Sequence, residues 1–190
     1  MNCIILLAAP AAGKGTISKY ISDNYNFDHI STGNLLRDEV SNGTEIGNQI
    51  SKLLSRGELV SDEIVFELLE KKLSNITNDF ILDGVPRNFS QAEALGDILS
   101  KYNIEISKKI FIDIDKEVAL SRMIQRSKEE SREDDNEETY NNRYKVFEEN
   151  TLPLLNYYND FSKIDNNGTL EHLYEQLDEL FKGDEKNGDL

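Results

Sequence analysis

The chain has 190 residues, and 36 acidic against 21 basic side chains give it a net charge of −15, so we expect neither nucleic acid nor an anionic membrane as a partner. Its hydrophobic fraction of 38% suits one domain over residues 1–190 with a buried core, and no apolar run approaches the ~20 residues of a membrane span. The single cysteine, Cys3, excludes a disulfide framework within the chain, and without a secretory signal at the N-terminus we expect a cytoplasmic protein.

Five short apolar runs alternate with longer helical patterns along the chain. The runs that we expect to be strands are residues 3–7, 27–30, 80–82, 110–114 and 161–164. This alternation predicts an α/β fold, in which a five-stranded parallel sheet is flanked by helices on both faces. Ligands of such sheets bind beyond the carboxyl ends of the strands.

The first of these strands leads into a loop that fits a phosphate-binding P-loop. Residues 8–16 read Ala-Ala-Pro-Ala-Ala-Gly-Lys-Gly-Thr, and the amphipathic stretch 17–25 follows, so the order is strand, tight loop and helix. Backbone N–H groups of such a loop surround a phosphate, and the helix N-terminus adds partial positive charge. Lys14 would reach the β- and γ-phosphates, and Thr16 would hold Mg²⁺ directly or through water. The alternative is a fortuitous Gly-Lys-Gly turn.

Two segments between the core elements read as insertions. Residues 31–60 are polar and helical, with glycines at 33, 43, 47 and 57 as punctuation. Residues 125–135 are dense in charge, which is typical of a mobile surface loop and also of a short lid that closes over bound phosphates.

Other residues allow more than one interpretation. Asp83 ends the third predicted strand, where it would hold Mg²⁺ through water or simply form a turn before Gly84. Helical spacing of aromatic side chains over 137–147 predicts core packing, and Cys3 is expected to be buried. His29 and His172 have no ligand-spaced partners, so we expect structural or surface roles rather than a metal site.

The order and spacing of these motifs resemble the adenylate kinases and related nucleoside monophosphate kinases over nearly all of residues 2–180. The loop has their Lys-Gly-Thr spacing at 14–16. Further matches are Ile-Ser-Thr-Gly-Asn-Leu-Leu-Arg at 30–37, Gly-Glu-Leu-Val at 57–60, Asp-Gly-Val-Pro-Arg at 83–87 with Gln91-Ala92, and Arg-Glu-Asp-Asp-Asn at 132–136 with Arg143. All of the arginines except Arg56 fall on motif positions, although ordinary surface salt bridges are the alternative.

The resemblance implies a P-loop kinase that transfers the γ-phosphoryl group of Mg-ATP to AMP, reversibly giving two ADP, by direct in-line displacement. It implies a nucleotide-acceptor (NMP-binding) insertion at 31–60 and a short lid at 125–135 within the single core domain. ATP and AMP are the implied partners, Mg²⁺ the implied cofactor and a monomer the implied state. The zinc site of longer lids requires cysteines that this chain lacks.

The resemblance also assigns the site residues. The side chains assigned to catalysis are Lys14, Arg87, Arg126, Arg132 and Arg143. The ATP site comprises Ala11, Ala12, Gly13, Lys14, Gly15, Thr16, Arg122, Arg126 and Gly168. The AMP site comprises Thr32, Arg37, Glu58, Leu59, Val60, Gly84, Val85, Pro86, Arg87, Gln91, Arg132 and Arg143. Thr16 and Asp83 are assigned to Mg²⁺, directly or through water.

Two departures from the family pattern concern the phosphate loop, where Ala8 and Ala11 replace glycines. Only glycine adopts positive φ cheaply, and forcing another residue there costs on the order of 1 kcal/mol or more. We therefore expect that the loop works but that kcat is open to reduction by the two alanines. Other departures are Ile17 for the usual Gln, Asn34 for Asp and Val85 for Phe.

The choice of acceptor rests on Thr32 and Gln91, which match family positions that favour adenine. Related pyrimidine kinases usually carry Ala at the position of Thr32, although a threonine there would also cap the following helix. A UMP/CMP or mixed nucleoside monophosphate kinase is therefore one alternative. The two alanines of the loop prompt another, a degenerate nucleotide-binding protein without activity.

Overall fold

Five parallel strands form the centre of the molecule, of which a computed structural model describes residues 1–130 and 136–185. The spatial order of the strands is β2-β3-β1-β4-β5, and every neighbouring pair is parallel. The strands are β1 (Asn2–Ala8), β2 (Asp28–Ser31), β3 (Phe80–Asp83), β4 (Glu105–Asp113) and β5 (Ser162–Asp165). The predicted α/β class with a five-stranded parallel sheet is confirmed.

The strands match the predicted ranges closely, except that β4 begins at Glu105 rather than at residue 110. Its amino-terminal half pairs with β1 from the Asn2–Glu105 register position onward, although Glu105 and Ser107 are exposed. An apolar run reveals only strand residues that are buried on both faces. The half-exposed start of β4 was therefore missed.

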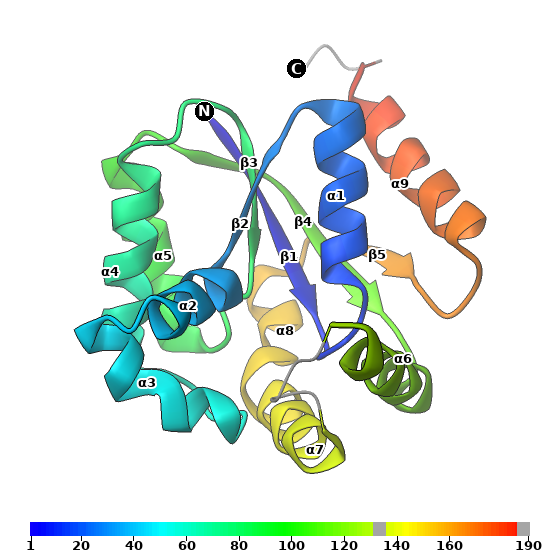
Figure 1. The fold of residues 1–190 in the computed structure, drawn as a ribbon. Coiled ribbons are helices and arrows are strands. Elements are labelled where there is room, and N and C mark those ends of the chain that lie inside the picture. Colours follow the sequence, from blue (N-terminus) through cyan, green and yellow to red (C-terminus); the bar gives the residue numbers. More distant parts are fainter. Residues whose placement is uncertain (131–135, 186–190) are drawn as a thin grey trace.

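Alternate residues of the central strands build two hydrophobic cores, one on each face of the sheet. On one face Ile4 and Ile81 pack with side chains of α1 (Lys14–Tyr25) and α9 (Leu170–Glu185). Figure 1 shows α1 and α9 together on one side of the sheet and α4 and α5 together on the other.

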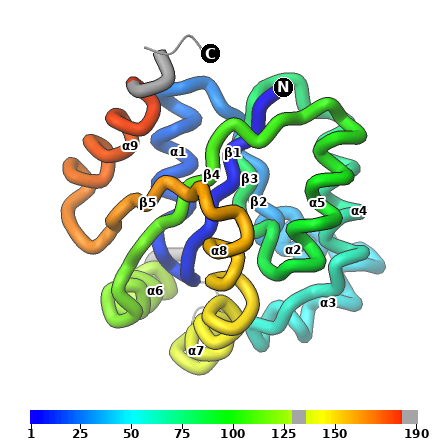
Figure 2. The backbone as a smooth tube through the Cα atoms, turned by 180° about the vertical axis from the view of Figure 1, so that it is seen from behind, coloured from blue at the N-terminus to red at the C-terminus, as the bar shows by residue number. Residues whose placement is uncertain are grey.

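On the second face Cys3, Ile5 and Leu82 pack with α4 (Asp62–Leu73) and α5 (Phe89–Lys101). Cys3 is buried as expected, and burial raises the pKa of its thiol far above the ordinary value. The view from behind in Figure 2 has α4 and α5 side by side, away from α1 and α9.

The segment between β2 and α4 is helical as predicted, with α2 (Thr32–Ser41) and α3 (Glu45–Ser55). The Ser31 hydroxyl caps α2 by accepting the backbone N–H of Asn34 at 3.4 Å, so Thr32 is the first helical residue and not the cap.

Gly47 is not a break between helices, because it lies inside α3 where that helix crosses α2. A Cβ on Gly47 would lie 2.1 Å from the carbonyl oxygen of Glu39. Only a glycine therefore permits this close contact of the two helices.

The carboxyl-terminal half adds α6 (Lys116–Glu130), α7 (Glu137–Val146), the short π-helical segment η1 (Phe147–Thr151) and α8 (Leu154–Tyr158). The aromatic residues of α7 and η1 do pack in the core, with Tyr140 and Phe147 buried and Tyr144 against them. Of the predicted lid, residues 125–130 belong to α6, whereas residues 131–135, including Arg132, lie outside the described residues. His172 is exposed on α9, as expected.

No helix among residues 1–130 and 136–185 combines the length and the apolar character needed to cross a membrane.

The loop between β1 and α1 contains the backbone strain expected for one of its two alanines. Ala11 has a φ of +58°, in the left-handed region, and Gly13 has a φ of +85°. Ala8, in contrast, ends β1 and is not among the residues with positive φ. The loop therefore has a left-handed backbone conformation at position 11, and the residue that adopts it is an alanine.

Replacing Ala11 by glycine is expected to stabilise the protein by roughly 0.5–1 kcal/mol in urea unfolding. Glycine relieves the left-handed strain, and this gain exceeds the added entropy of the unfolded chain. The control, Ala8→Gly, adds the same flexibility at a strand residue without strain and should destabilise the protein by about 0.5–1 kcal/mol. Equal losses in the two variants would show that Ala11 is not strained.

Candidate active site

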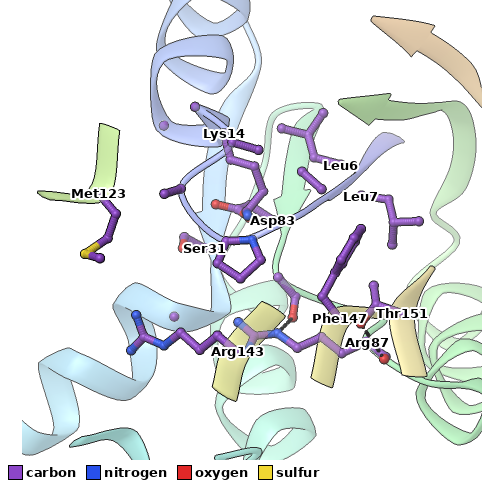
Figure 3. Close-up of a pocket in the computed structure, with 18 of the residues that line it drawn as sticks. Leu6, Leu7, Lys14, Ser31, Asp83, Arg87, Met123, Arg143, Phe147 and Thr151 are labelled. Carbon is purple, nitrogen blue, oxygen red and sulfur yellow. Dashed lines mark hydrogen bonds between the residues drawn. The ribbon is translucent and has the colours of Figure 1, made fainter. Parts of the chain in front are cut away.

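A cleft of about 770 Å³ opens at the carboxyl ends of the strands. The phosphate loop after β1, Ser31 at the end of β2 and Asp83 at the end of β3 all line it. Because β1 pairs directly with β3 and Leu6 lies opposite Asp83, the carboxylate is set beside the loop. Sheet topology thus joins motifs that are far apart in the sequence, and Figure 3 shows their side chains around this cleft.

The predicted ATP-binding residues all lie along this cleft. They come from the phosphate loop and the start of α1, from α6 and from the turn before α9, namely Ala11, Ala12, Gly13, Lys14, Gly15, Thr16, Arg122, Arg126 and Gly168.

Asn166, the residue after β5, holds the phosphate loop by a hydrogen bond. This amide is 3% exposed, and its Nδ2 donates to the carbonyl oxygen of Ala12 at 2.8 Å. Its backbone N–H donates to the carbonyl oxygen of Asp113 at 2.9 Å, which ties the loop to the end of β4. A Cβ on Gly13 would lie 2.6 Å from the same Nδ2, so the close approach depends on glycine. Asn166 was not predicted from the sequence; its place just beyond the predicted strand at 161–164 was a signal for the cleft, but its contact with Ala12 left none.

Lys14 lies at the centre of a group of positive charges. Its Nζ is 3.4 Å from the carbonyl oxygen of Ala9, and Figure 3 shows the side chain extending toward Asp83. Burial lowers the pKa of Lys14, the charge of Asp83 opposes this, and Arg87, Arg126 and Arg143 lower the pKa further, so that the net shift is downward. Within a chain of charge −15, this cleft is therefore a local site for anions.

Asp83 is the negative charge within that group. The residue is 7% exposed, and burial alone would raise its pKa. The charge of Lys14, the adjacent imidazole of His29 and the charge of Arg87 outweigh burial, so the pKa of Asp83 is held below its ordinary value. Asp83 is accordingly ionised at neutral pH.

His29 was expected to be structural or a surface residue, but it lies at the cleft. Its Nε2 is 3.5 Å from Oδ2 of Asp83, and both residues line the cleft. The pairing of β2 with β3 creates this contact. The sequence spacing held no signal for it, because the partner is more than fifty residues away.

Arg87 is fixed on several sides before any ligand binds. Its Nε donates to the carbonyl oxygen of Gly84 at 2.7 Å, and its own carbonyl oxygen accepts the hydroxyl of Thr151 at 2.7 Å. Its backbone N–H donates to Oε1 of Gln91 at 2.8 Å. Burial lowers the pKa of Arg87, Asp83 opposes this shift, and neighbouring arginines add to it. The guanidinium is thus pre-positioned in a cationic surrounding.

A side pocket of about 20 Å³ joins the cleft between α2, α3 and α4. Its walls are mostly apolar and include Leu36, Leu54 and Val65, whereas Thr32 and Gln91 bring polar groups. The Thr32 hydroxyl donates to the carbonyl oxygen of Asp83 at 3.2 Å. The pocket therefore combines mostly apolar walls with a few polar groups.

Most predicted AMP-binding residues line one hollow or the other. Those that do are Thr32, Arg37, Glu58, Leu59, Val60, Gly84, Pro86, Arg87, Gln91 and Arg143. Val85 lines neither, because it is 1% exposed and packs in the second core. Arg132 lies outside the described residues.

Comparison with known proteins agrees with this arrangement. A family model described as adenylate kinase matches residues 6–163. An adenylate kinase of Prochlorococcus marinus subsp. pastoris is 40% identical over 163 residues, which is 86% of each chain. An adenylate kinase of Xanthomonas campestris pv. campestris is 38% identical over 179 residues, covering 92% of this chain and 96% of that protein. The chain therefore belongs to the adenylate kinase family.

Proposed function

We propose that this chain, acting as a cytoplasmic monomer, reversibly transfers the γ-phosphoryl group of Mg-ATP to AMP and so forms two ADP. The observation that carries the proposal is the group of cations around Asp83, which lies between the phosphate loop and the side pocket. Two nucleotides bound in these two hollows would meet with their phosphates at this group. Family membership supports the same reaction.

The donor would occupy the phosphate-loop side of the cleft. Backbone N–H groups around Gly13 and the N-terminus of α1 suit the β- and γ-phosphates. Arg122 and Arg126, both on α6, are proposed to hold the donor, with Gly168 near its base. The lid at 125–135, with Arg132, is proposed to close over the phosphates and exclude water.

The acceptor would place its base in the side pocket. The apolar walls suit the faces of a base, and residues 58–60 are among them, although the pocket of about 20 Å³ would have to widen to admit a purine. Arg37 and Arg87 are proposed to bind the acceptor phosphate at the point where the side pocket meets the cleft. A guanidinium suits this role because it contacts phosphate oxygens in pairs.

The chemistry requires position and charge rather than a covalent intermediate. An oxygen of the acceptor phosphate attacks the γ-phosphorus in line, and this oxygen is already ionised, so no general base is needed. Lys14, Arg126 and Arg143 would stabilise the charge that spreads over the transferring group. Because Lys14 is already held in the phosphate loop beside Asp83, it needs little reorganisation at the moment of transfer.

Asp83 and Thr16 fit a magnesium ion that reaches the protein mainly through water. Asp83 supplies one ionised carboxylate beside the phosphate loop, and Thr16 supplies a hydroxyl at the start of α1. Among the described residues no cluster of three or more His, Cys, Asp or Glu side chains would hold a metal by itself. A site with one or two protein oxygens, completed by phosphates and water, suits Mg²⁺. When bound, the ion would neutralise charge on the donor phosphates.

The first experiment is an acceptor panel. Purified protein is incubated with Mg-ATP and AMP, CMP, UMP, GMP or no acceptor, and the diphosphates are quantified by chromatography. Rapid ADP formation with AMP alone is expected. Turnover with CMP or UMP would instead indicate a pyrimidine kinase, and ATP binding without turnover would indicate a degenerate nucleotide-binding protein.

Thr32→Ala is expected to reduce the AMP:CMP ratio of kcat/KM roughly fivefold. The change removes a buried hydroxyl from the wall of the side pocket, and a lost polar contact of this kind is worth ~1 kcal/mol. Thr32→Ser retains the hydroxyl and should retain most of the ratio. A ratio that does not change in Thr32→Ala would remove Thr32 from the selection of the base.

Asp83→Asn is expected to lower stability at pH 7 but not in acid. The folded pKa of Asp83 is below the ordinary 3.8, so its ionised form stabilises the fold above that value and the effect is lost as the pH falls through the folded pKa. Urea unfolding at pH 7 should show a loss of about 1–3 kcal/mol, as for other buried charged partners.

The control for this experiment is Asp113→Asn, which removes the carboxylate of an exposed pair with Lys163. Its effect at pH 7 should be much smaller, because water screens exposed pairs. A difference between wild type and Asp83→Asn that persists undiminished at pH 3 would contradict the assigned ionisation.

A further inference from the structure

Gln91 presents an amide to the side pocket, and the orientation of that amide decides what it can bind. The residue is 1% exposed and lines the pocket proposed for the acceptor base. An amide has an oxygen that only accepts and a nitrogen that only donates, in nearly the same shape. Its neighbours must therefore determine which end lies where.

Two neighbours of opposite character fix the Gln91 amide. Oε1 accepts the backbone N–H of Arg87 at 2.8 Å, and Nε2 donates to Oδ1 of Asp62 at 2.8 Å. A backbone N–H can only donate, and a carboxylate can only accept. The reversed amide would place its NH₂ against the N–H and its oxygen against the carboxylate, so only one orientation is satisfied.

Asp62 is itself held in place, and it lies behind Gln91 rather than in the pocket. It is the first residue of α4, and its Oδ2 accepts the hydroxyl of Ser90 on α5. Asp62 lines neither the cleft nor the side pocket. It therefore acts on a bound base only through Gln91.

The fixed amide retains one N–H and one lone pair for a ligand. Adenine offers an amino donor beside the acceptor N1, and cytosine shows the same order with its amino group and N3. Hypoxanthine and uracil reverse both groups, with a carbonyl oxygen beside an N–H. An amide that cannot turn can accept from the amino group and donate to the ring nitrogen of adenine or cytosine. Against hypoxanthine or uracil it would place oxygen against oxygen and N–H against N–H.

We propose that Asp62 is a positioning residue that locks the Gln91 amide and thereby favours acceptor nucleotides whose base has an amino group beside an accepting ring nitrogen, the order found in adenine. The inference rests on the proposed function, since it concerns the base of the phosphoryl acceptor. The isosteric pair AMP and IMP tests it most directly, because the two differ only at the groups that the amide would contact.

The experiment compares kcat/KM for AMP and IMP in wild type and Asp62→Asn. Asparagine has the same shape but can offer either an oxygen or an NH₂ to Gln91, so this neighbour no longer opposes a turned amide and only the backbone N–H of Arg87 still does. The AMP:IMP ratio is expected to fall about fivefold, through a rise for IMP, while KM for ATP stays unchanged. Asp62→Ala, which also removes the carboxylate, serves as the second variant.

The matched control is Glu63→Gln, which removes the same charge from the next residue, an exposed one. This variant should keep the wild-type ratio. A merely structural role of Asp62 would lower the values for AMP and IMP together, and an unchanged ratio in Asp62→Asn overturns the proposal.

Calorimetric binding of AMP and IMP to the same proteins separates this inference from the proposed function. Wild type that binds AMP without turning it over contradicts the proposed kinase activity, and the ratio of the two dissociation constants then decides the role of Asp62. A ratio that falls in Asp62→Asn supports the lock, whereas a constant ratio rejects it.

Discussion

The attraction between Asp83 and the surrounding cations is the interaction on which the rest of the site depends. Lys14 and Arg87 are both desolvated, and the charge of Arg87 lowers the pKa of Lys14. Their repulsion would open the cleft without a negative partner. The parallel register that places Leu6 opposite Asp83 supplies that partner from the neighbouring strand. The strand register therefore determines the charge balance of the site, because it places the carboxylate of Asp83 beside the cations of the cleft.

Neutral hydrogen bonds complete this electrostatic frame. Asn166 ties the phosphate loop to the ends of β4 and β5, and Thr151 of η1 holds the backbone of Arg87. These contacts do not weaken with salt as exposed ion pairs do. The positions of the cations thus depend on buried amides and hydroxyls, whereas their charges remain available for a polyanionic ligand.

The sequence predicted the parts of the fold that local patterns encode. Apolar runs located the strands, because burial on both faces leaves a local pattern, whereas the strain at Ala11 was expected from the resemblance, since related loops have glycine there. The contacts of His29 and Asn166 could not be predicted, since strand pairing and a distant loop create them. The motif position of Val85 likewise did not reveal that its side chain turns into the core.

The residues proposed for base recognition and for phosphate binding share one hydrogen bond. The backbone N–H of Arg87 donates to the Gln91 amide, and the guanidinium of the same residue projects toward the cleft. A base that displaces the amide therefore disturbs the residue proposed to bind the acceptor phosphate. Selection coupled in this way acts on the reaction step as well as on binding, because a misplaced phosphate oxygen loses the in-line geometry. Through the hydrogen bond between Arg87 and Gln91, a base bound in the side pocket would thus affect the position of the acceptor phosphate in the cleft.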